Sequence, residues 1–402
     1  MNMTPRGCSS IGGDLAYGME ECRNKALGLF TSYGYNPFNP AEFQLLEGTM
    51  KNLHRRRRER VIAVNSPFGE PCCLRADITL SALSYMALHH SPEEFPLRLC
   101  YAERVFAAPR APKENIEDTQ VGAELLGWEG LGADVEVIAM LLAAMDDLGL
   151  DDSVIVLGDA SIAPSLFEGL PGNLAENLVD YLQEGAYYDY GRAISGAAEL
   201  SGRDRKILGE LPFLKGTADI LGHAEELFGR SEILRPLFEI SGALARLGHG
   251  GRVRIDLGFI RDLGYYNGPI FNIYSSPDGV LLGGGGRYDG ALADTRFSCQ
   301  AVGFGVSLRE AALARRPAAR TSRVMIWSGA APADRALSYA SLLAGRGVSF
   351  EISWNPNLEE SKSFAISRGC AWLVNIEDDR ALDLSSGRQT TPSEIGDEVL
   401  CR

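Results

Sequence analysis

The chain has 402 residues, a formal net charge of -14 and a pI of about 5.0. This acidic balance excludes a general attraction to a phosphate backbone, although a local basic patch could still bind one. The sequence has neither an apolar signal segment at its start nor a run of about eighteen apolar residues, which argues against export and membrane insertion. We therefore expect a cytoplasmic protein of two domains, with a core large enough to need no disulfide or metal.

The eight cysteines form no CxxC pair and no regular framework. This distribution is typical of buried free thiols in a reducing compartment, so we expect neither disulfides nor a metal site. Nothing else in the sequence indicates a cofactor.

The first part of the chain changes from helical to strand periodicity. Apolar positions at helical spacing predict an amphipathic helix over residues 14–33, and Gly34 follows where a C-cap glycine would lie. Shorter periods predict a hairpin of strands 61–65 and 71–74, which leads into the segment LRADIT. The basic run at residues 54–60 is most simply a solvated helix end or loop; the alternative is a contact with nucleic acid or nucleotide phosphates.

A second antiparallel pair of strands is predicted over residues 97–106 and 118–127. The proline-rich segment between them, residues 108–113, must be a loop. Residues 135–147 are expected to form a helix and residues 154–158 a strand.

A long helical block follows this strand. Its helical periods are broken by Gly and Pro, and it looks like an insertion of about residues 163–250. The strand-rich segment 253–274, the turn 277–279, the glycine run 283–286 and the amphipathic segment 301–314 complete the first domain.

The segment 315–320 is a plausible linker between a domain of residues 1–320 and a second one of residues 321–402. Three expected strands alternate with helical segments in the second domain: residues 324–327, 348–352 and 372–376. This alternation is typical of a small α/β domain with a mainly parallel sheet, and the chain ends soon after the third of these strands.

Six sequence pieces occur in one order along the first domain: a segment that contains Pro40, LRADIT, DTQVGAELLG, RDLGYYNG, GGGGRYDG and AVGFGVSLRE. A glycine run taken alone is more simply a tight turn. Together the pieces resemble the catalytic domain of histidyl-tRNA synthetases and of their paralogues, the regulatory subunits of ATP phosphoribosyltransferase. The resemblance implies an α+β fold of the class II aminoacyl-tRNA synthetase type. This fold has an antiparallel sheet with helices, a helical insertion, a C-terminal domain like an anticodon-binding module, and a dimer contact around Pro40.

The resemblance also implies a histidine site. The family's LR-x-(D/E)-x-T and Q-x-G-x-E pieces hold the ammonium group, and its R-x-L-x-Y-Y piece supplies an arginine for the carboxylate and a tyrosine for the imidazole. The matching residues are Asp77, Thr79, Gln120, Glu124, Arg261, Tyr265 and Tyr266.

The chemistry of free histidine fits this set. The ligand presents an ammonium, a carboxylate and two distinct ring nitrogens, which need anionic acceptors, a cationic fork and polar groups. Asp77 with Thr79 and Gln120 suits the ammonium, Arg261 suits the carboxylate, and Glu124 with Tyr266 suits the imidazole. Taken singly, a tyrosine pair is more often core packing and an isolated Gln or Glu is more often a surface residue. Their joint occurrence favours a histidine or histidine-like ligand.

Two arginines that the family uses to activate amino acids with ATP are missing. Ala107 stands where the family has the arginine of its F-R pair, and Glu310 stands at the arginine position of the family's G-x-E-R. Arg309 should not simply replace it, because a shift of one residue turns a helical side chain by about 100°. The alternative is that Arg104 or Arg110 reaches back from the neighbouring loop. A further departure lies after LRADIT, where an arginine often found in the paralogue is absent from residues 80–84.

A protein that keeps a histidine site and loses the activation chemistry fits a sensor and not an enzyme. The resemblance then implies a regulatory subunit that pairs with the short form of the ATP phosphoribosyltransferase catalytic subunit, as a homodimer within a hetero-oligomer, with histidine as effector and without tRNA. Two alternatives stay open: a divergent but active histidyl-tRNA synthetase, and an interaction or scaffold protein whose pocket is vestigial.

Overall fold

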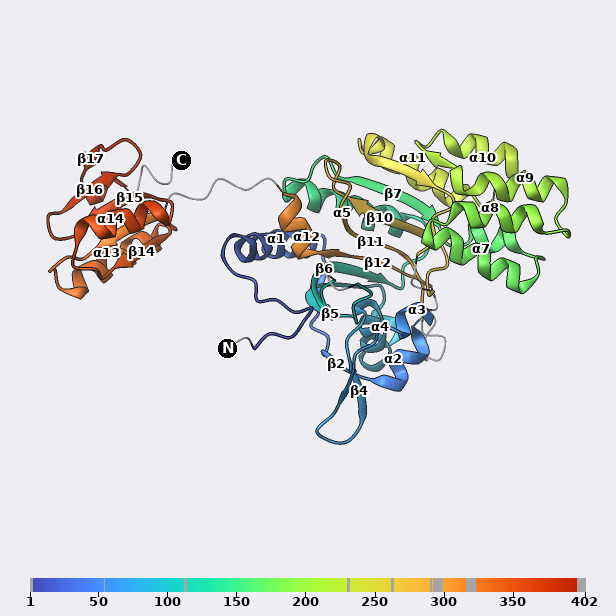
Figure 1. Cartoon of the computed structure of the whole chain (residues 1–402), viewed down its shortest axis with the longest axis horizontal. Coiled ribbons are helices and arrows are strands. Elements are labelled where there is room, and N and C mark those ends of the chain that lie inside the picture. The colour runs from blue at the N-terminus through green and yellow to red at the C-terminus, as the bar shows by residue number, and fades with distance from the viewer. Residues whose placement is uncertain are drawn as a thin grey trace. The chain divides into compact units, whose positions relative to one another are not determined.

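The computed structural model describes residues 3–53, 55–111, 114–229, 232–261, 264–289, 291, 299–315 and 323–395. Most of the expected linker, the end of the loop at residues 108–113 and His54 lie outside this description. The chain divides into two compact units, with the boundary between Arg315 and Arg316 (Figure 1).

The described part of the first unit is built on a nine-stranded sheet, antiparallel from β5 through β7. In spatial order its strands are β1 (Asn36–Pro37), β5 (Leu97–Phe106), β6 (Glu117–Leu126), β12 (Ala301–Ser307), β11 (Leu281–Arg287), β10 (Pro269–Tyr274), β7 (Val154–Asp159), β9 (Val253–Asp256) and β8 (Lys215–Gly216). The expected pair at residues 97–106 and 118–127 is confirmed as β5 and β6. A small separate sheet contains β2 (Phe43–Leu45), β4 (Pro71–Leu74) and β3 (Ala63–Asn65), which confirms the predicted hairpin.

Helices cover one face of the large sheet and form its main core. They are α1 (Gly13–Ser32), α5 (Gly132–Asp147) and α12 (Leu308–Ala314). Alternation along the strands supplies the sheet side of this core, because successive side chains point to opposite faces. On β5, Cys100 and Ala102 face this core, whereas Leu99 and Tyr101 belong to a second core on the other face.

The second core contains α4 (Ile78–His89), and this face of the sheet holds the candidate site. Shorter helices α2 (Leu46–Asn52) and α3 (Arg55–Arg58) precede it in the chain. The segment 301–314, expected to be amphipathic, divides into strand β12 and helix α12.

Six described helices lie between β7 and β9, two strands that pair in parallel. They are α6 (Ile162–Phe167), α7 (Gly172–Glu184), α8 (Tyr187–Gly196), α9 (Gly202–Glu210), α10 (Ile220–Phe228) and α11 (Arg235–Arg246). Figure 1 shows α7 to α10 clustered beside the end of the sheet that holds β7. The helical block is thus an excursion between neighbouring strands.

The second unit has a five-stranded sheet within residues 323–395. Its order is β14 (Phe350–Ser353), β13 (Arg323–Trp327), β15 (Cys370–Asn375), β16 (Arg380–Asp383) and β17 (Gln389–Thr390), with α13 (Ala333–Gly345) and α14 (Leu358–Ser367) packed into opposite cores. The three predicted strands are parallel, as expected. Two antiparallel strands that the sequence analysis did not expect, β16 and β17, follow the third of them.

No helix in the described ranges is long and apolar enough to span a bilayer.

Candidate functional site

A cavity of about 390 Å³, here called the first cavity, lies on the α4 face of the large sheet. Its size is within the usual range of small-molecule sites. Six of the seven residues predicted for a histidine site line it: Asp77, Thr79, Gln120, Arg261, Tyr265 and Tyr266. These residues come from three segments: the start of α4, strand β6 and the loop between β9 and β10. The seventh residue, Glu124, lies behind this lining.

Asp77 is fixed at the start of helix α4. Its backbone is extended, and its Oδ1 accepts a hydrogen bond from the Leu80 amide at 2.9 Å, which is the usual contact of an N-cap residue. Its Oδ2 accepts a hydrogen bond from the Tyr265 hydroxyl at 3.0 Å. The carboxylate is therefore held in place from two segments while it borders the first cavity, and it keeps lone pairs for a cationic ligand group.

Glu124 is completely buried behind Thr79. The Thr79 hydroxyl donates to its Oε1 at 2.8 Å, the Tyr101 hydroxyl donates at 3.4 Å, and the Tyr288 hydroxyl donates to Oε2. Burial raises the pKa of Glu124 to about 8, although these hydrogen bonds lower it. The sequence analysis expected Glu124 to contact the imidazole; in the structure its link to the cavity runs through Thr79.

Arg261, Tyr265 and Tyr266 lie on the loop between β9 and β10. The two tyrosine rings are 4.9 Å apart between centroids, and the Arg261 guanidinium lies 5.3 Å from the Tyr266 centroid. Arg261 Nη1 also donates to the Phe271 carbonyl at 2.7 Å. The loop thus presents a cation stacked on an aromatic ring, an arrangement that attracts the two groups.

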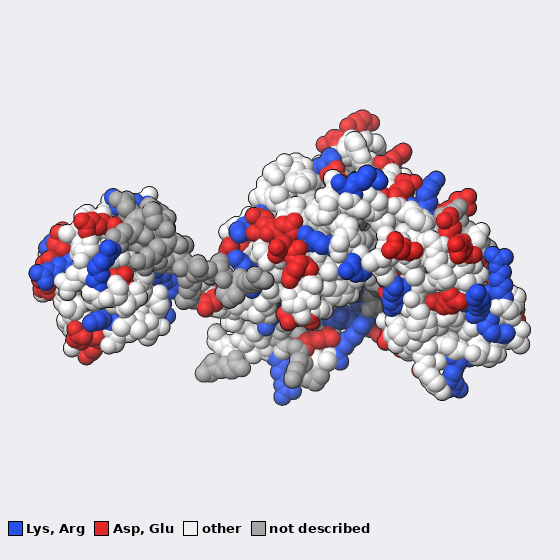
Figure 2. All heavy atoms as spheres, turned by 90° about the horizontal axis from the view of Figure 1, so that it is seen from above, with Lys and Arg blue, Asp and Glu red and all other residues white. Residues whose placement is uncertain are grey.

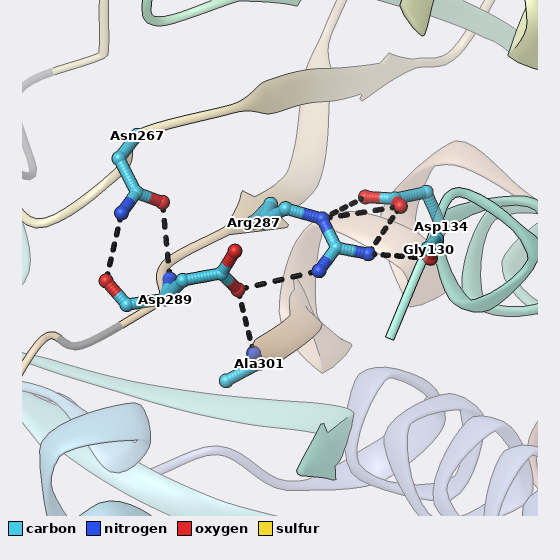
Figure 3. Close-up of polar contacts among 6 residues, drawn as sticks. All are labelled: Gly130, Asp134, Asn267, Arg287, Asp289 and Ala301. Carbon is cyan, nitrogen blue, oxygen red and sulfur yellow. Dashed lines mark hydrogen bonds and ion pairs between the residues drawn. The ribbon is translucent and has the colours of Figure 1, made fainter. Parts of the chain in front are cut away.

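A polar network that is buried at Arg287 and Asp134 and exposed at Asn267 holds the far end of this loop (Figure 3). The Arg287 guanidinium donates to both Asp134 oxygens, to the Gly130 carbonyl at 2.9 Å and to Asp289 Oδ1 at 3.2 Å. Asn267, which follows the tyrosine pair, exchanges two hydrogen bonds with the Asp289 backbone, at 2.7 and 3.0 Å. The network therefore ties the loop to β11 and to helix α5.

Glycines clear space on the sheet side of the first cavity. A Cβ at Gly303 would overlap the Glu124 carboxylate, and one at Gly284 would overlap the Arg261 guanidinium. The glycine run 283–286 lies inside strand β11. The interpretation of this run as a tight turn is wrong, because these residues are glycine for close approach within the sheet.

Sequence analysis missed three residues of the site. Tyr101 pairs with Gly122 across β5 and β6 and lines the first cavity; the alternation of β5 places it there. Tyr288 lies in the quoted GGGGRYDG piece, and its ring is 5.8 Å from that of Tyr265. Arg57 belongs to the basic run and also lines the first cavity.

A second cavity, of about 630 Å³, adjoins the first and shares four lining residues with it: Asn115, Glu117, Asp118 and Arg309. The Ser307 hydroxyl donates to Asp118 at 2.7 Å, and burial raises the pKa of Asp118. Glu310 also lines the first cavity. Glu117 and Asp118 thus lie at this shared end together with Arg309.

The positions discussed for nucleotide chemistry fall in different places. Among the described residues, neither Ala107 nor Arg110 lines either cavity, and Arg104 lines the second cavity, 3.6 Å from Glu117. Arg309 lines both cavities beside Glu310. Arg309, one residue before the family's arginine position, therefore places a cation at the shared end. The sequence analysis did not expect this, because a shift of one residue turns a helical side chain by about 100°.

The described residues contain no group of three or more His, Cys, Asp or Glu side chains that could hold a metal ion. Seven cysteines within these ranges are free thiols, five of them buried.

The family model described as Histidyl-tRNA synthetase matches residues 11–311. A protein of Moorella thermoacetica named ATP phosphoribosyltransferase regulatory subunit is 30% identical over 333 residues, which cover 79% of this chain and 83% of the relative. A protein of the same name from Cupriavidus pinatubonensis is 31% identical over 341 residues, which cover 82% and 86%.

Two solved structures share the fold. A Bacillus halodurans C protein, described as an ATP phosphoribosyltransferase regulatory subunit/histidyl-tRNA synthetase, has a TM-score of 0.81 and 22% identity and covers 93% of this chain and 98% of its own. A histidyl-tRNA synthetase from Nostoc sp. PCC 7120 has a TM-score of 0.80 and 17% identity over 100% of both chains. The class II synthetase fold is thereby confirmed. From the sequence relatives, the chain belongs to the family of ATP phosphoribosyltransferase regulatory subunits, which has the fold of histidyl-tRNA synthetases.

Proposed function

We propose that this chain is a non-catalytic subunit that binds free histidine in the first cavity and transmits feedback inhibition to ATP phosphoribosyltransferase. The observation that carries the proposal is the meeting of Asp77, Gln120 and Arg261 with a tyrosine pair around one cavity. Asp77 and Gln120 offer acceptors for the ammonium, and Arg261 offers donors for the carboxylate. Tyr266 and the Thr79–Glu124 pair offer polar groups to the ring nitrogens.

The shared end of the cavities supports a binding role without amino-acid activation. Activation builds negative charge on the ATP α-phosphate, and loss of one preorganised cation costs roughly a hundredfold or more in rate. Here Glu310 and Asp118 border that end. The alternative, an active synthetase, draws support from Arg309, and it predicts histidine-dependent exchange of pyrophosphate into ATP.

The partner we propose is the short-form catalytic subunit of ATP phosphoribosyltransferase, the enzyme named in the relatives' descriptions. Histidine can inhibit only if it binds the inhibited state of the complex more tightly than the active one, and a coupling of about 1 to 3 kcal/mol would be ordinary. Expressed together, the two chains should co-purify, and histidine should lower the activity of the complex. Failure to co-purify would contradict the assignment.

A homodimer within this complex is supported by an apolar groove near Pro40. Exposed Phe43, Leu45 and Leu88 line it, at 55%, 60% and 75% exposure. Groups of exposed apolar side chains mark interaction sites. Light scattering should report a dimer of this chain alone, and a charged residue at Leu45 should shift it toward the monomer.

We propose no tRNA partner and a cytoplasmic location. Figure 2 shows Lys and Arg side chains interspersed with Asp and Glu over the face drawn, a pattern that favours no polyanion. The free thiols fit a reducing compartment. A gel-shift assay with histidine tRNA at physiological salt should show no complex.

A further inference from the structure

One arginine of the basic run differs from its neighbours. Arg58 Nε donates to the Leu53 carbonyl at 2.7 Å, and Arg60 donates to the Ala108 carbonyl at 2.9 Å and pairs with Glu114 at 3.0 Å. The Arg57 carbonyl accepts a hydrogen bond from the Arg60 amide at 3.0 Å. The Arg57 side chain is half-buried and lines the first cavity, and no hydrogen bond or ion pair joins the guanidinium to any residue that the structure describes. Its neighbours therefore stabilise the local fold, whereas the Arg57 guanidinium is available to a ligand.

Arg57 acts on the same tyrosine pair as Arg261. Burial raises the pKa of Tyr265 well above its usual value, Asp77, Tyr266 and Glu124 raise it further, and the positive charge of Arg57 lowers it. Arg261 lies over the neighbouring ring of Tyr266. Two guanidiniums from distant segments thus approach the aromatic part of the first cavity, and Arg261 already donates to the Phe271 carbonyl.

None of the described acidic residues that line the first cavity forms an ion pair with Arg57. Asp77 accepts hydrogen bonds from Leu80 and Tyr265, Asp118 accepts from Ser307, and Glu117 pairs with Arg104. The Arg57 guanidinium therefore keeps hydrogen-bond donors that no described side chain takes up. An anionic group on a ligand would supply the missing partner, and a planar guanidinium matches a carboxylate with two parallel hydrogen bonds.

We propose that Arg57 is a second ligand-binding arginine, which takes the α-carboxylate of the amino acid held in the first cavity and selects ligands that carry one. This inference rests on the proposed binding of histidine. It assigns a function to one residue of the basic run, for which a solvated surface was the simpler interpretation. Arg261 then orders the tyrosine pair and completes the carboxylate site.

The test compares histidine with histidinol, which keeps the ammonium and imidazole and replaces the carboxylate by a hydroxymethyl group. Calorimetric titrations should show that Arg57→Gln weakens histidine binding about tenfold or more and leaves histidinol binding unchanged. Arg57→Lys should give an intermediate histidine affinity, because the charge remains without the planar fork. Arg58→Gln is the matched control, since it removes the same charge from the same short helix outside the cavity, and it should bind both ligands as the unmodified protein does.

Equal affinity of Arg57→Gln and the unmodified protein for histidine would overturn the inference. An equal loss for both ligands would also overturn it, because the residue would then act on the shape of the cavity. If Arg57→Gln unfolds at a lower temperature than the unmodified protein, Arg57→Lys decides the question. A lysine variant whose melting temperature and histidine affinity are both unchanged would show that the planar guanidinium has no role in binding. If the unmodified protein binds neither ligand, the proposed histidine site itself is wrong.

Discussion

The two ends of the first cavity differ in how their charges are arranged. At the end proposed to bind the amino acid, Asp77 accepts hydrogen bonds from the Leu80 amide and the Tyr265 hydroxyl. The Arg261 guanidinium lies over the Tyr266 ring at the same end. At the end shared with the second cavity lie Asp118 and Arg309, and Glu310 lines the first cavity beside Arg309. This difference is the basis of our proposal that recognition of an amino acid and its activation use separable parts of one fold.

The supports of the two ends also differ. The amino-acid end depends on a loop anchored by the Arg287 network and on a floor of glycines in β11 and β12. The shared end depends on the start of α12, where the Ser307 hydroxyl caps the helix and binds Asp118. Substitutions can therefore change one end and leave the other intact.

The largest effect should come from Asp134→Ala, which leaves the buried Arg287 guanidinium without its main partner. Breaking a buried pair from one side costs about 3 to 5 kcal/mol, so the free energy of unfolding should fall by that amount in urea titrations, and histidine binding should weaken. The matched control on the same helix is Asp146→Ala, which breaks a more exposed pair with Arg252 and should cost about 1 kcal/mol at most. Equal losses in the two variants would contradict the role given to the network.

Gly303→Ala should add a methyl group to the end of the first cavity that is proposed to bind the amino acid. The added methyl group would overlap Glu124, so we expect a loss of stability of about 3 kcal/mol and no measurable histidine binding. Gly216→Ala in strand β8, outside the cavity, is the control, because its Cβ would meet only the Ile220 side chain, at 4.0 Å. Retained binding in Gly303→Ala would place the ligand elsewhere.

A smaller, pH-dependent effect should arise from Glu124. Its pKa is raised from 4.5 to about 8, so the neutral carboxyl is favoured in the folded state. The stability it contributes is complete below about pH 4.5 and falls as pH rises through about 8, because the folded protein binds the extra proton in that window. Relative to Glu124→Gln, the unmodified protein should lose roughly 3 to 4 kcal/mol between pH 5 and 8 in thermal or urea unfolding.

The control for this pH series is Glu225→Gln, which changes an exposed carboxylate on the helical insertion. Its difference from the unmodified protein should stay constant across the same pH range. A constant difference for Glu124→Gln as well would show that Glu124 stays charged in the fold.

The smallest effect should come from the shared end. Glu310→Arg replaces a repelling carboxylate by a cation, so ATP affinity should rise by about tenfold, or about 1.4 kcal/mol, in a fluorescent nucleotide competition assay. Glu310→Gln should give less, since it removes repulsion without adding attraction. Histidine affinity should not change in either variant, and a parallel loss of histidine binding would show that the two ends are not separable.

The sequence predicted most of the first unit, because its elements follow clear periods. The two-residue period of β6 places Gln120 and Glu124 on one face, and the helix at residues 14–33 is confirmed as α1. This periodicity predicts the face of the sheet to which a side chain points, but not how deeply the side chain is buried. It could not show that Glu124 lies behind Thr79, because this burial depends on Tyr101 of strand β5 and on Tyr288, which follows strand β11.

Other features lacked a local pattern. The run of arginines that contains Arg57 has no apolar residues at helix or strand spacing, so the sequence does not indicate which side faces the protein. That Arg57 lines the first cavity follows from tertiary packing alone. Strands β16 and β17 are short and partly exposed, which left no alternation long enough to recognise. The glycines of β11 were ambiguous, because a run of glycines fits a turn as well as a close strand contact.

The most direct test of a cavity that recognises an amino acid without activating it is a calorimetric titration of the purified, folded chain with histidine. The account predicts saturable heat at one site per chain, lost in Gly303→Ala and unaffected by Glu310→Gln. Absence of heat from the folded protein, or equal binding of amino acids that lack an imidazole, would contradict it.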